Sequence, residues 1–372
     1  MYKISKTLRF ILINVVPSVL DDKAALYDLE ELKSLVETFG GATIVRIIQR
    51  KSAPDPGMYV GTGKAKEIGE MIKQEKIDVV VINDIVKPVQ LFNLKKVFLP
   101  YNQSVEVWDR IDLILQIFDK HAQSAESKLQ IELARMRHMG PRIFGMGYVL
   151  SRQAGGIGTR GIGETNTELM KRHWRTAMKK VNDQLIRLSD DRERKLLRRK
   201  KMGFRTVSIV GYTNAGKSTL FNAITKKKKL TADALFATLD SSLGKVYLPG
   251  IKKEVLISDT IGFIQNLPPQ LIRAFKSTLM ESLYADLLLH VVDISDSRKH
   301  EKIEVVQDIL RGMGIEEKDQ IIVFNKADAQ ENINTQDLDE IYEKYSPLYI
   351  SAQTGANLDQ LLQSIEDRFR YI

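Results

Sequence analysis

The 372-residue sequence contains no cysteine, and no apolar run approaches the ~20 residues that a membrane-spanning helix needs. Without cysteine the chain can form neither disulfides nor thiolate metal sites, which fits a reducing compartment. The apolar stretch Arg9–Pro17 is followed by no small-residue cleavage site, so it predicts a first β-strand rather than a signal peptide. We expect a soluble cytoplasmic protein without a transmembrane segment. Peripheral association with a membrane stays open.

Acidic residues are scarce in one part of the chain. The whole sequence has a net charge of +9, and residues 121–202 alone hold 19 Lys or Arg against 8 Asp or Glu. Clustered Lys and Arg bind polyanions by releasing the counterions of phosphate groups. This segment therefore predicts a nucleic-acid partner, with a solvated helix surface as the alternative.

Short β-rich runs alternate with helix-like stretches up to about residue 109, which predicts a small α/β domain over residues 1–109. The expected strands are Phe10–Val16, Ala42–Ile48, Asp78–Asn83 and Ser104–Val107. The expected helices are Asp21–Thr38, Lys64–Gln74 and Val89–Val97.

Residues 110–202 predict a basic helical hairpin. Apolar residues recur three and four apart from Arg110 to about Met139, and a second helix is expected from Thr165 to Lys201. The segment 151–165 between them is rich in glycine and carries Arg152 and Arg160. A cationic loop of this kind can lie close to RNA backbone, so both arginines are candidate RNA contacts; a purely structural flexible loop is the alternative.

Residues 203–372 alternate strand and helix in the order of a Ras-like domain with a mostly parallel sheet. After the β-branched run Val207–Val210 comes an unbroken G-x-x-x-x-G-K-S, whose backbone amides can surround a phosphate chain. Its lysine can reach the β- and γ-phosphates, and its serine can bind Mg²⁺. The candidate phosphate-binding residues are Gly211, Tyr212, Thr213, Asn214, Ala215, Gly216, Lys217, Ser218 and Thr219.

Two further motifs at strand ends select the nucleotide. Asp259-Thr260-Ile261-Gly262 can hold Mg²⁺ through water and meet the γ-phosphate, while Asp328 can accept hydrogen bonds from the N1–H and amine of guanine. GTP or GDP with Mg²⁺ is therefore the expected ligand. The remaining candidate contacts are Phe236, Thr238, Asp259, Thr260, Ile261, Gly262, Asn325, Lys326, Asp328, Ser351 and Ala352. We assign Mg²⁺ to Ser218, Thr238 and Asp259, and catalysis to Lys217, Thr238 and Gly262.

Phe263 follows Gly262, at the position where many small GTPases have the glutamine that orients the attacking water. A phenyl ring can make no such hydrogen bond. The sequence therefore predicts slow intrinsic hydrolysis, with the water-positioning group unidentified.

Together these residues resemble the HflX-type GTPases, translation-factor-related proteins. The resemblance rests on Lys128–Ala134, on the glycine-rich segment with Leu150–Gln153 and Gly163–Thr165, on Phe236–Asp240, and on Asp259–Ile264 with Leu267-Pro268. It implies a factor that binds the large ribosomal subunit through rRNA, that splits or rescues stalled ribosomes under stress, and whose hydrolysis the ribosome stimulates. We expect a monomer when it is free.

The sequence departs from the family pattern at Ile162, at Asn166-Thr167 and in Asp240–Leu243. The last departure puts any role of a switch I arginine in doubt. Two other functions stay open: a ribosome-assembly GTPase acting on precursor large subunits, and an RNA-binding module that uses GTP only as a conformational lock.

Overall fold

The computed structural model describes residues 7–154, 166–226, 235–236, 242–260, 262–265, 279–329 and 335–370, without the side chains of 145–154, 166 and 167. The chain divides into two compact units, Met1–Lys120 with Leu129–Gln184, and His121–Lys128 with Leu185–Ile372. The three domains expected from the sequence, bounded near residues 110 and 202, stay a prediction.

The first unit is built on a parallel sheet with the strand order β2-β1-β3-β4. The strands are β1 (Arg9–Val16), β2 (Ala42–Arg50), β3 (Val79–Ile82) and β4 (Glu106–Asp109). The helices that accompany them are α1 (Asp22–Phe39), α2 (Thr62–Gln74), α3 (Pro88–Phe98) and α4 (Arg110–His121). The expected α/β domain is confirmed, with strand and helix ends within about two residues of the prediction.

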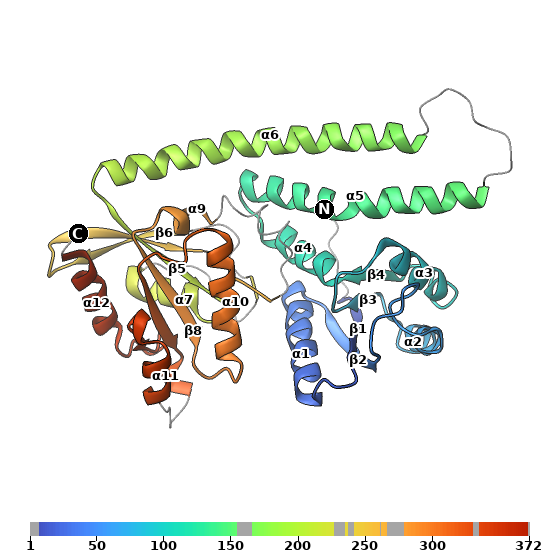
Figure 1. The fold of residues 1–372 in the computed structure, drawn as a ribbon, viewed down its shortest axis with the longest axis horizontal. Helices are drawn as coiled ribbons and strands as arrows, with labels where there is room; N and C mark the ends of the chain where they lie inside the picture. The colour runs from blue at the N-terminus through green and yellow to red at the C-terminus, as the bar shows by residue number, and fades with distance from the viewer. Residues whose placement is uncertain are drawn as a thin grey trace. The chain divides into compact units, whose positions relative to one another are not determined.

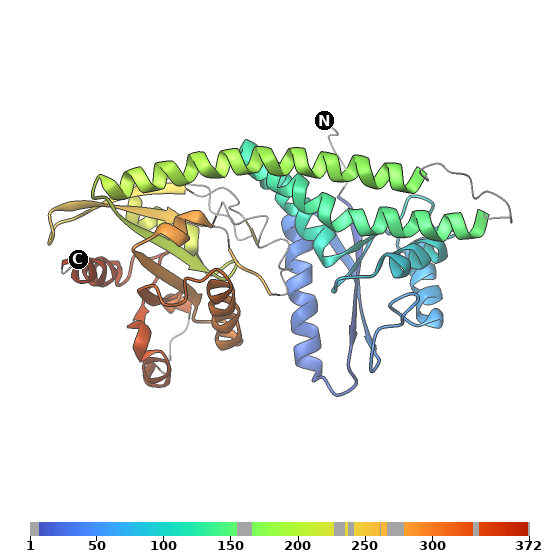
Figure 2. The same ribbon diagram turned by 45° about the horizontal axis from the view of Figure 1, so that its top comes forward.

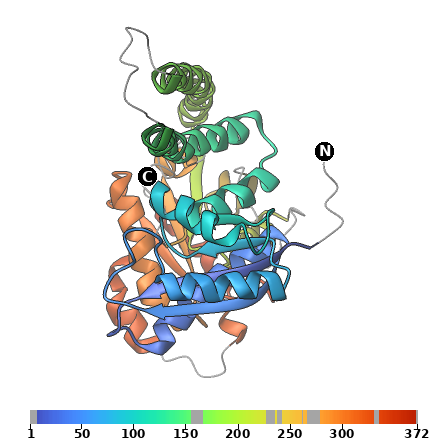
Figure 3. The same ribbon diagram turned by 90° about the vertical axis from the view of Figure 1, so that its right-hand side faces the viewer.

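Both faces of this sheet are covered, which explains why β1 is apolar almost throughout. Ile11 and Ile13 belong to the core cluster beneath α2 and α3. Phe10 points to the other face, where its ring lies 5.9 Å from that of Phe39 and 5.8 Å from that of Trp108. Figures 1 and 2 show α1 on one side of the strands and α2 with α3 on the other, and in Figure 3 α2 lies in front of the sheet.

The expected single helix from Arg110 to about Met139 is wrong in two respects. It breaks after α4, and α5 (Ala125–Ala154) starts afresh because Ser124 Oγ accepts a hydrogen bond from the Ser127 amide at 3.0 Å. Beyond Met139 the helix continues through Pro141. The second long helix, α6 (Asn166–Lys201), agrees with its prediction.

Within the first unit, α5 and α6 run antiparallel. Trp174 Nε1 of α6 donates to the Met136 carbonyl of α5 at 3.1 Å, and its ring meets that of Phe144 edge to face. Gly140 lies beneath this indole, because a Cβ there would be 3.1 Å from Trp174 Nε1. The antiparallel helix pair was predicted, and it is observed where these residues meet.

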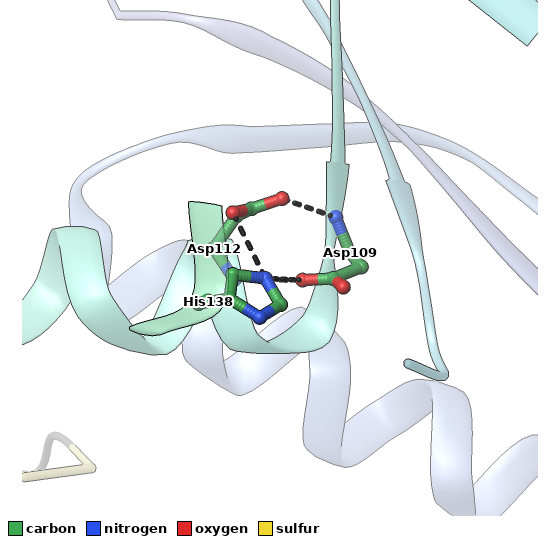
Figure 4. Close-up of side chains that lie close together, drawn as sticks. All are labelled: Asp109, Asp112 and His138. Atoms are coloured by element: carbon green, nitrogen blue, oxygen red, sulfur yellow. Dashed lines mark hydrogen bonds and ion pairs between the residues drawn. The ribbon is translucent and has the colours of Figure 1, made fainter. Parts of the chain in front are cut away.

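A cluster of charged side chains holds α5 against the junction of β4 and α4. Asp109 and Asp112 cap the start of α4 reciprocally, each carboxylate accepting the other residue's amide at 2.9 and 3.0 Å. From α5, His138 Nε2 lies 3.1 Å from Asp109 and 3.3 Å from Asp112 (Figure 4). The guanidinium of Arg142 bonds both carboxylates as well.

Asp109, Asp112 and His138 have the composition of a metal site, with ligand atoms all within 4.8 Å of one another. Arg142 argues against a bound cation, because its guanidinium already occupies one oxygen of each carboxylate. Two carboxylates facing two cationic side chains balance in charge. We therefore interpret this cluster as an ion-pair cluster that joins α5 to the sheet.

The second unit is built on a sheet of order β10-β9-β8-β5-β7-β6, parallel except for β6. The strands are β5 (Arg205–Gly211), β6 (Ser242–Leu248), β7 (Lys253–Asp259), β8 (Leu287–Asp293), β9 (Gln320–Asn325) and β10 (Leu348–Tyr349). The helices are α7 (Lys217–Thr225), α9 (Met280–Tyr284), α10 (Lys299–Gly312), η1 (Ala327–Ala329), α11 (Thr335–Ile341), η2 (Glu343–Tyr345) and α12 (Leu358–Arg370), labelled in Figure 1 where there is room.

Helices cover both faces of this second sheet. Leu220 of α7 and Ile365 of α12 pack in one core cluster, while Ile303 of α10 and Leu338 of α11 pack in the other. The predicted Ras-like, mostly parallel architecture is confirmed. Among the helices of the described residues, none has the length and apolarity needed to cross a bilayer.

The C-terminal part of α6 is bonded to α9 in this unit. The buried carboxylate of Glu281 accepts from Arg199 Nη1 at 3.4 Å, and Tyr284 donates its hydroxyl to Glu193. Ser282 in turn shares a 2.9 Å hydrogen bond with Ser208 of β5. The end of the long helix is thus attached to the central strand through α9.

Raising the pH should weaken the ion-pair cluster. Burial by itself would lower the pKa of His138, but its hydrogen bonds to Asp109 and Asp112 outweigh burial and raise the pKa from 6.5 to about 9. The contribution of protonated His138 to the unfolding free energy is therefore fully present below pH 6.5 and is lost as the pH rises through about 9. This contribution is on the order of 3 kcal/mol.

The measurement is hydrogen exchange of the first unit's sheet amides between pH 6 and 10, corrected for intrinsic exchange rates. His138→Gln should flatten this dependence, whereas His173→Gln, at an exposed position on α6, should keep the wild-type profile. An unchanged pH dependence in His138→Gln would contradict the assignment.

Candidate nucleotide site

Three parallel strands bring the sequence motifs to one edge of the second sheet. β5 pairs in parallel with β7 and β8, and β8 pairs in parallel with β9. The carboxyl ends of β5, β7 and β9 are Gly211, Asp259 and Asn325. Ligands of open α/β sheets bind outside the carboxyl ends of the strands, so this edge is the natural position for a site.

The loop between β5 and α7 turns back tightly at two positions with left-handed backbone, Asn214 (φ 62°) and Gly216 (φ 89°). Gly216 is required for a second reason, because a Cβ there would lie 2.1 Å from the Asn325 amide nitrogen. The loop then enters α7 at Lys217, with Ser218 and Thr219 half-buried in its first turn. A helix N-terminus preceded by such a loop presents its free amides to an anion.

Lys217 is a buried cation at the start of α7, with a side chain only 6% exposed. Its Nζ donates to the Tyr212 carbonyl at 2.5 Å, and burial lowers its pKa to about 8 although Asp259 opposes the shift. Gly262 lies directly against it: a Cβ there would be 2.8 Å from Lys217 Nζ and 3.0 Å from Thr213 Cα. The structure thus places the lysine of one motif beside the glycine of the other.

Ser218 and Asp259 also meet. Ser218 Oγ donates to Asp259 Oδ2 at 2.7 Å, and Asp259 is fully buried. Beside them, the Thr260 hydroxyl donates to the Ile209 carbonyl at 2.7 Å and so keeps the start of this motif against β5. A hydroxyl and a carboxylate oxygen this close are ligand types that suit Mg²⁺.

Asn325 joins the phosphate-binding loop to the loop after β10. Its amide nitrogen donates to the Ala215 carbonyl at 2.9 Å, and its amide oxygen accepts from the Ala352 N–H at 2.9 Å. Lys326 reaches back to Asp293 at 2.7 Å, and Ser351 is buried next to Ala352. The side chain of Asp328, in η1, is exposed to solvent.

The other predicted site residues are placed as follows. Phe236 is buried, with a left-handed backbone of φ 58°. Thr238, Ile261 and Arg160 lie outside the described residues, as does the side chain of Arg152. The assignment of roles to all these residues stays a prediction.

One feature of the site was not predicted, namely a backbone bridge between its two phosphate motifs. The Phe263 amide donates to the Gly211 carbonyl at 3.1 Å, and the Thr213 amide donates to the Phe263 carbonyl at 2.7 Å. The phenyl ring itself is 2% exposed. Periodicity could not reveal the bridge, because it joins single residues that are far apart in sequence.

Three family models cover most of the chain: a GTP-binding GTPase N-terminal region at residues 27–119, a GTP-binding GTPase middle region at 121–199, and a 50S ribosome-binding GTPase at 206–326. GTPase HflX of Caldanaerobacter subterraneus is 42% identical over 358 residues, which span 96% of this chain and 80% of that protein. The chain belongs to the HflX family of GTPases. It is accordingly a GTP hydrolase that binds GTP and GDP.

HflX proteins of other organisms are similar to this chain as well. The Escherichia coli protein is 42% identical over 92% of this chain and 79% of its own length. Among solved structures, the SsGBP–GDP complex covers 97% of this chain and 98% of its own, at 26% identity and a TM-score of 0.56. A GTP-binding protein of Sulfolobus solfataricus in complex with GDP matches at 25% identity and a TM-score of 0.52. The match covers 97% of this chain and 98% of that one. The family likeness therefore extends across both compact units.

Asn325→Ala should destabilise the nucleotide-binding unit, because it leaves the Ala215 carbonyl and the Ala352 amide without their buried partner. We expect a loss of about 2–3 kcal/mol in unfolding free energy and weaker binding of both GTP and GDP. Denaturant unfolding and nucleotide titration measure the two effects. Asn93→Ala, which removes a comparable bond to the Gly57 carbonyl in the first unit, should leave nucleotide affinity unchanged; equal losses in both variants would contradict this role.

Proposed function

We propose that this protein is a ribosome-associated GTPase that binds the large ribosomal subunit and splits or rescues stalled ribosomes under stress. The proposal also includes the residue roles at the nucleotide site and Mg²⁺ as the metal. We further propose three domains, residues 1–109, 110–202 and 203–372, and a cytoplasmic protein that is a monomer when free.

The phosphate chain of GTP would lie across the N-terminus of α7. In that position residues 211–219 offer their amides, Lys217 faces the β- and γ-phosphates, and the Gly262 amide meets the γ-phosphate. Ser218, Thr238 and Asp259 would hold Mg²⁺, which neutralises charge on the β- and γ-phosphate oxygens when bound. The observation that carries this assignment is the meeting of Lys217 with Gly262 and of Ser218 with Asp259.

Guanine would be read by Asp328, whose two carboxylate oxygens match the N1–H and the exocyclic amine. Asn325, Lys326, Ser351 and Ala352 hold the surrounding loops, as their hydrogen bonds indicate. The exposed carboxylate of Asp328 is free to meet a base from solvent. This arrangement accounts for the choice of GTP over ATP.

Asp328→Asn should weaken GTP binding, because an amide opposes one of guanine's two donors with a donor of its own. It should improve binding of xanthosine triphosphate, whose 2-oxo group can accept from that amide. We expect a loss of roughly 100-fold or more for GTP, equal to about 3 kcal/mol for a charged hydrogen bond lost. Competition titrations with the two nucleotides measure the ratio, and an unchanged ratio would refute the guanine contact.

Ribosome association is supported by the family and by the charge of α6. One matching family model describes a 50S ribosome-binding GTPase. Basic side chains stand exposed along the helix, and rRNA is the polyanion that the subunit offers. They are Arg172, Arg175, Lys179, Lys180, Arg187, Arg194, Lys195, Arg198, Lys200 and Lys201.

The attachment of α6 to α9 supports a link between subunit binding and the nucleotide cycle. α9 begins at Met280, eighteen residues after Gly262, and its Glu281 holds Arg199 of α6. A change in the position of α6 on rRNA would therefore act on α9 and, through Ser282 and Ser208, on β5, whose carboxyl end begins the phosphate-binding loop. Phe263 supplies no water-orienting group, so basal hydrolysis would be slow until the ribosome stimulates it.

Purified protein should hydrolyse GTP slowly alone and much faster with large ribosomal subunits, but not with small subunits or free RNA. With GTP it should also dissociate intact ribosomes, which sucrose-gradient sedimentation detects. Preference for immature particles would favour the assembly function instead. If the protein is recycled from the ribosome as well with a hydrolysis-blocked GTP analogue as with GTP, the conformational lock would be favoured.

A paired variant tests the RNA contacts in the same assay. Arg152→Ala/Arg160→Ala should weaken subunit binding on the order of tenfold by removing two cationic contacts to phosphate, while basal hydrolysis is kept. The matched control is Lys252→Ala/Lys253→Ala, which removes the same charge from two exposed positions at the start of β7. Equal weakening in both pairs would show that net charge alone governs binding.

A further inference from the structure

Tyr212 is the first of the four variable residues in the G-x-x-x-x-G-K-S loop, and it is only 5% exposed. Its hydroxyl accepts a hydrogen bond from the Gln265 backbone amide at 2.8 Å. Gln265 lies three residues after Gly262, so one tyrosine links the loop to the segment that carries the γ-phosphate contact.

This bond extends the backbone bridge between the two motifs. Phe263 already exchanges hydrogen bonds with Gly211 and Thr213 on either side of Tyr212, at 3.1 and 2.7 Å. The Tyr212 hydroxyl adds a third attachment two residues further along. Gly262 is therefore followed by a segment that is held to the phosphate-binding loop at two residues, Phe263 and Gln265.

A third element holds the tyrosine ring. Lys302, in the first turn of α10, places its Nζ 4.6 Å from the centroid of the Tyr212 ring. The same ammonium group is ion-paired with Asp296 in the loop before the helix. A cation over the ring face, itself held by a carboxylate, restrains the ring and so the position of its hydroxyl.

We propose that Tyr212 is a positioning residue for recognition of the γ-phosphate. Held by Lys302, it keeps the segment after Gly262 in register with the phosphate-binding loop, so that the Gly262 amide is directed at the third phosphate. This inference rests on the GTP site proposed above. GTP is the ligand that benefits, because GDP has no group at the position that Gly262 reads.

Tyr212→Phe removes only the hydroxyl and keeps the ring beneath Lys302. Loss of one hydrogen bond should weaken a non-hydrolysable GTP analogue roughly threefold to tenfold, while GDP affinity stays within about twofold. Stopped-flow binding of fluorescent nucleotides to the full chain measures both. Tyr247→Phe, at a tyrosine 58% exposed on β6, is the matched control and should change neither affinity.

Lys302→Met keeps the aliphatic stem and removes the cation. It should reduce affinity for the GTP analogue about twofold to threefold in the wild-type background, and should have no further effect in Tyr212→Phe, because it acts through the hydroxyl. Independent effects of the two substitutions would overturn the role of Lys302.

The results separate positioning from simple structural support. If Tyr212→Phe loses affinity for the GTP analogue and for GDP equally, with a lower melting temperature, Tyr212 only stabilises the loop. If neither affinity changes, the proposal is also overturned. Because no ribosome is present, failure of the ribosome function leaves this test intact. Absence of any GTP binding by the wild-type chain would instead refute the site itself.

Discussion

The parallel placement of β5 beside β7 and β8, with β9 beside β8, is the constraint on which the nucleotide site depends. It brings Gly211, Asp259 and Asn325, which are far apart in sequence, to one edge of one sheet. Because these strands are buried on both faces, their register is held by the core clusters packed on them. A site made of short loops is thereby given the rigidity of the sheet, and the same β5 also holds α9 through Ser208 and Ser282.

The close approach of Lys217 and Gly262 is the second feature on which the nucleotide site depends. Lys217 is buried, and Gly262 lies against it with no room for a side chain. The desolvated ammonium of Lys217 donates to the Tyr212 carbonyl, and the charge of Asp259 partly offsets the cost of burying it. The first unit solves a comparable problem internally, because Asp109, Asp112, His138 and Arg142 neutralise one another.

Local patterns predicted the regular elements well. The alternation of apolar runs located all four strands of the first sheet, and the motifs located the ends of β5, β7 and β9, since each pattern reflects neighbours in sequence. The break between α4 and α5 was missed because the apolar residues before Asp119 and after Lys128 were read as one pattern, although the ten residues between them hold no large apolar side chain and the Ser124 cap was a visible signal. The passage of α5 through Pro141 was not expected, because a proline inside a helix removes a backbone hydrogen bond; the structure shows the helix continuing there, with Gly140 packed beneath Trp174.

The sequence by itself determined the class of ligand, since the G-x-x-x-x-G-K-S, Asp259–Gly262 and Asn325–Asp328 patterns need only residue type and spacing. It also showed that Phe263 replaces a glutamine and that positive charge gathers in residues 121–202. Only the tertiary structure decided that Phe263 bridges to Gly211, that Tyr212 reaches Gln265, and that Arg199 reaches Glu281. These contacts join residues fifty or more positions apart, and a hydrogen bond at such separation depends on distances that only the folded sheet establishes.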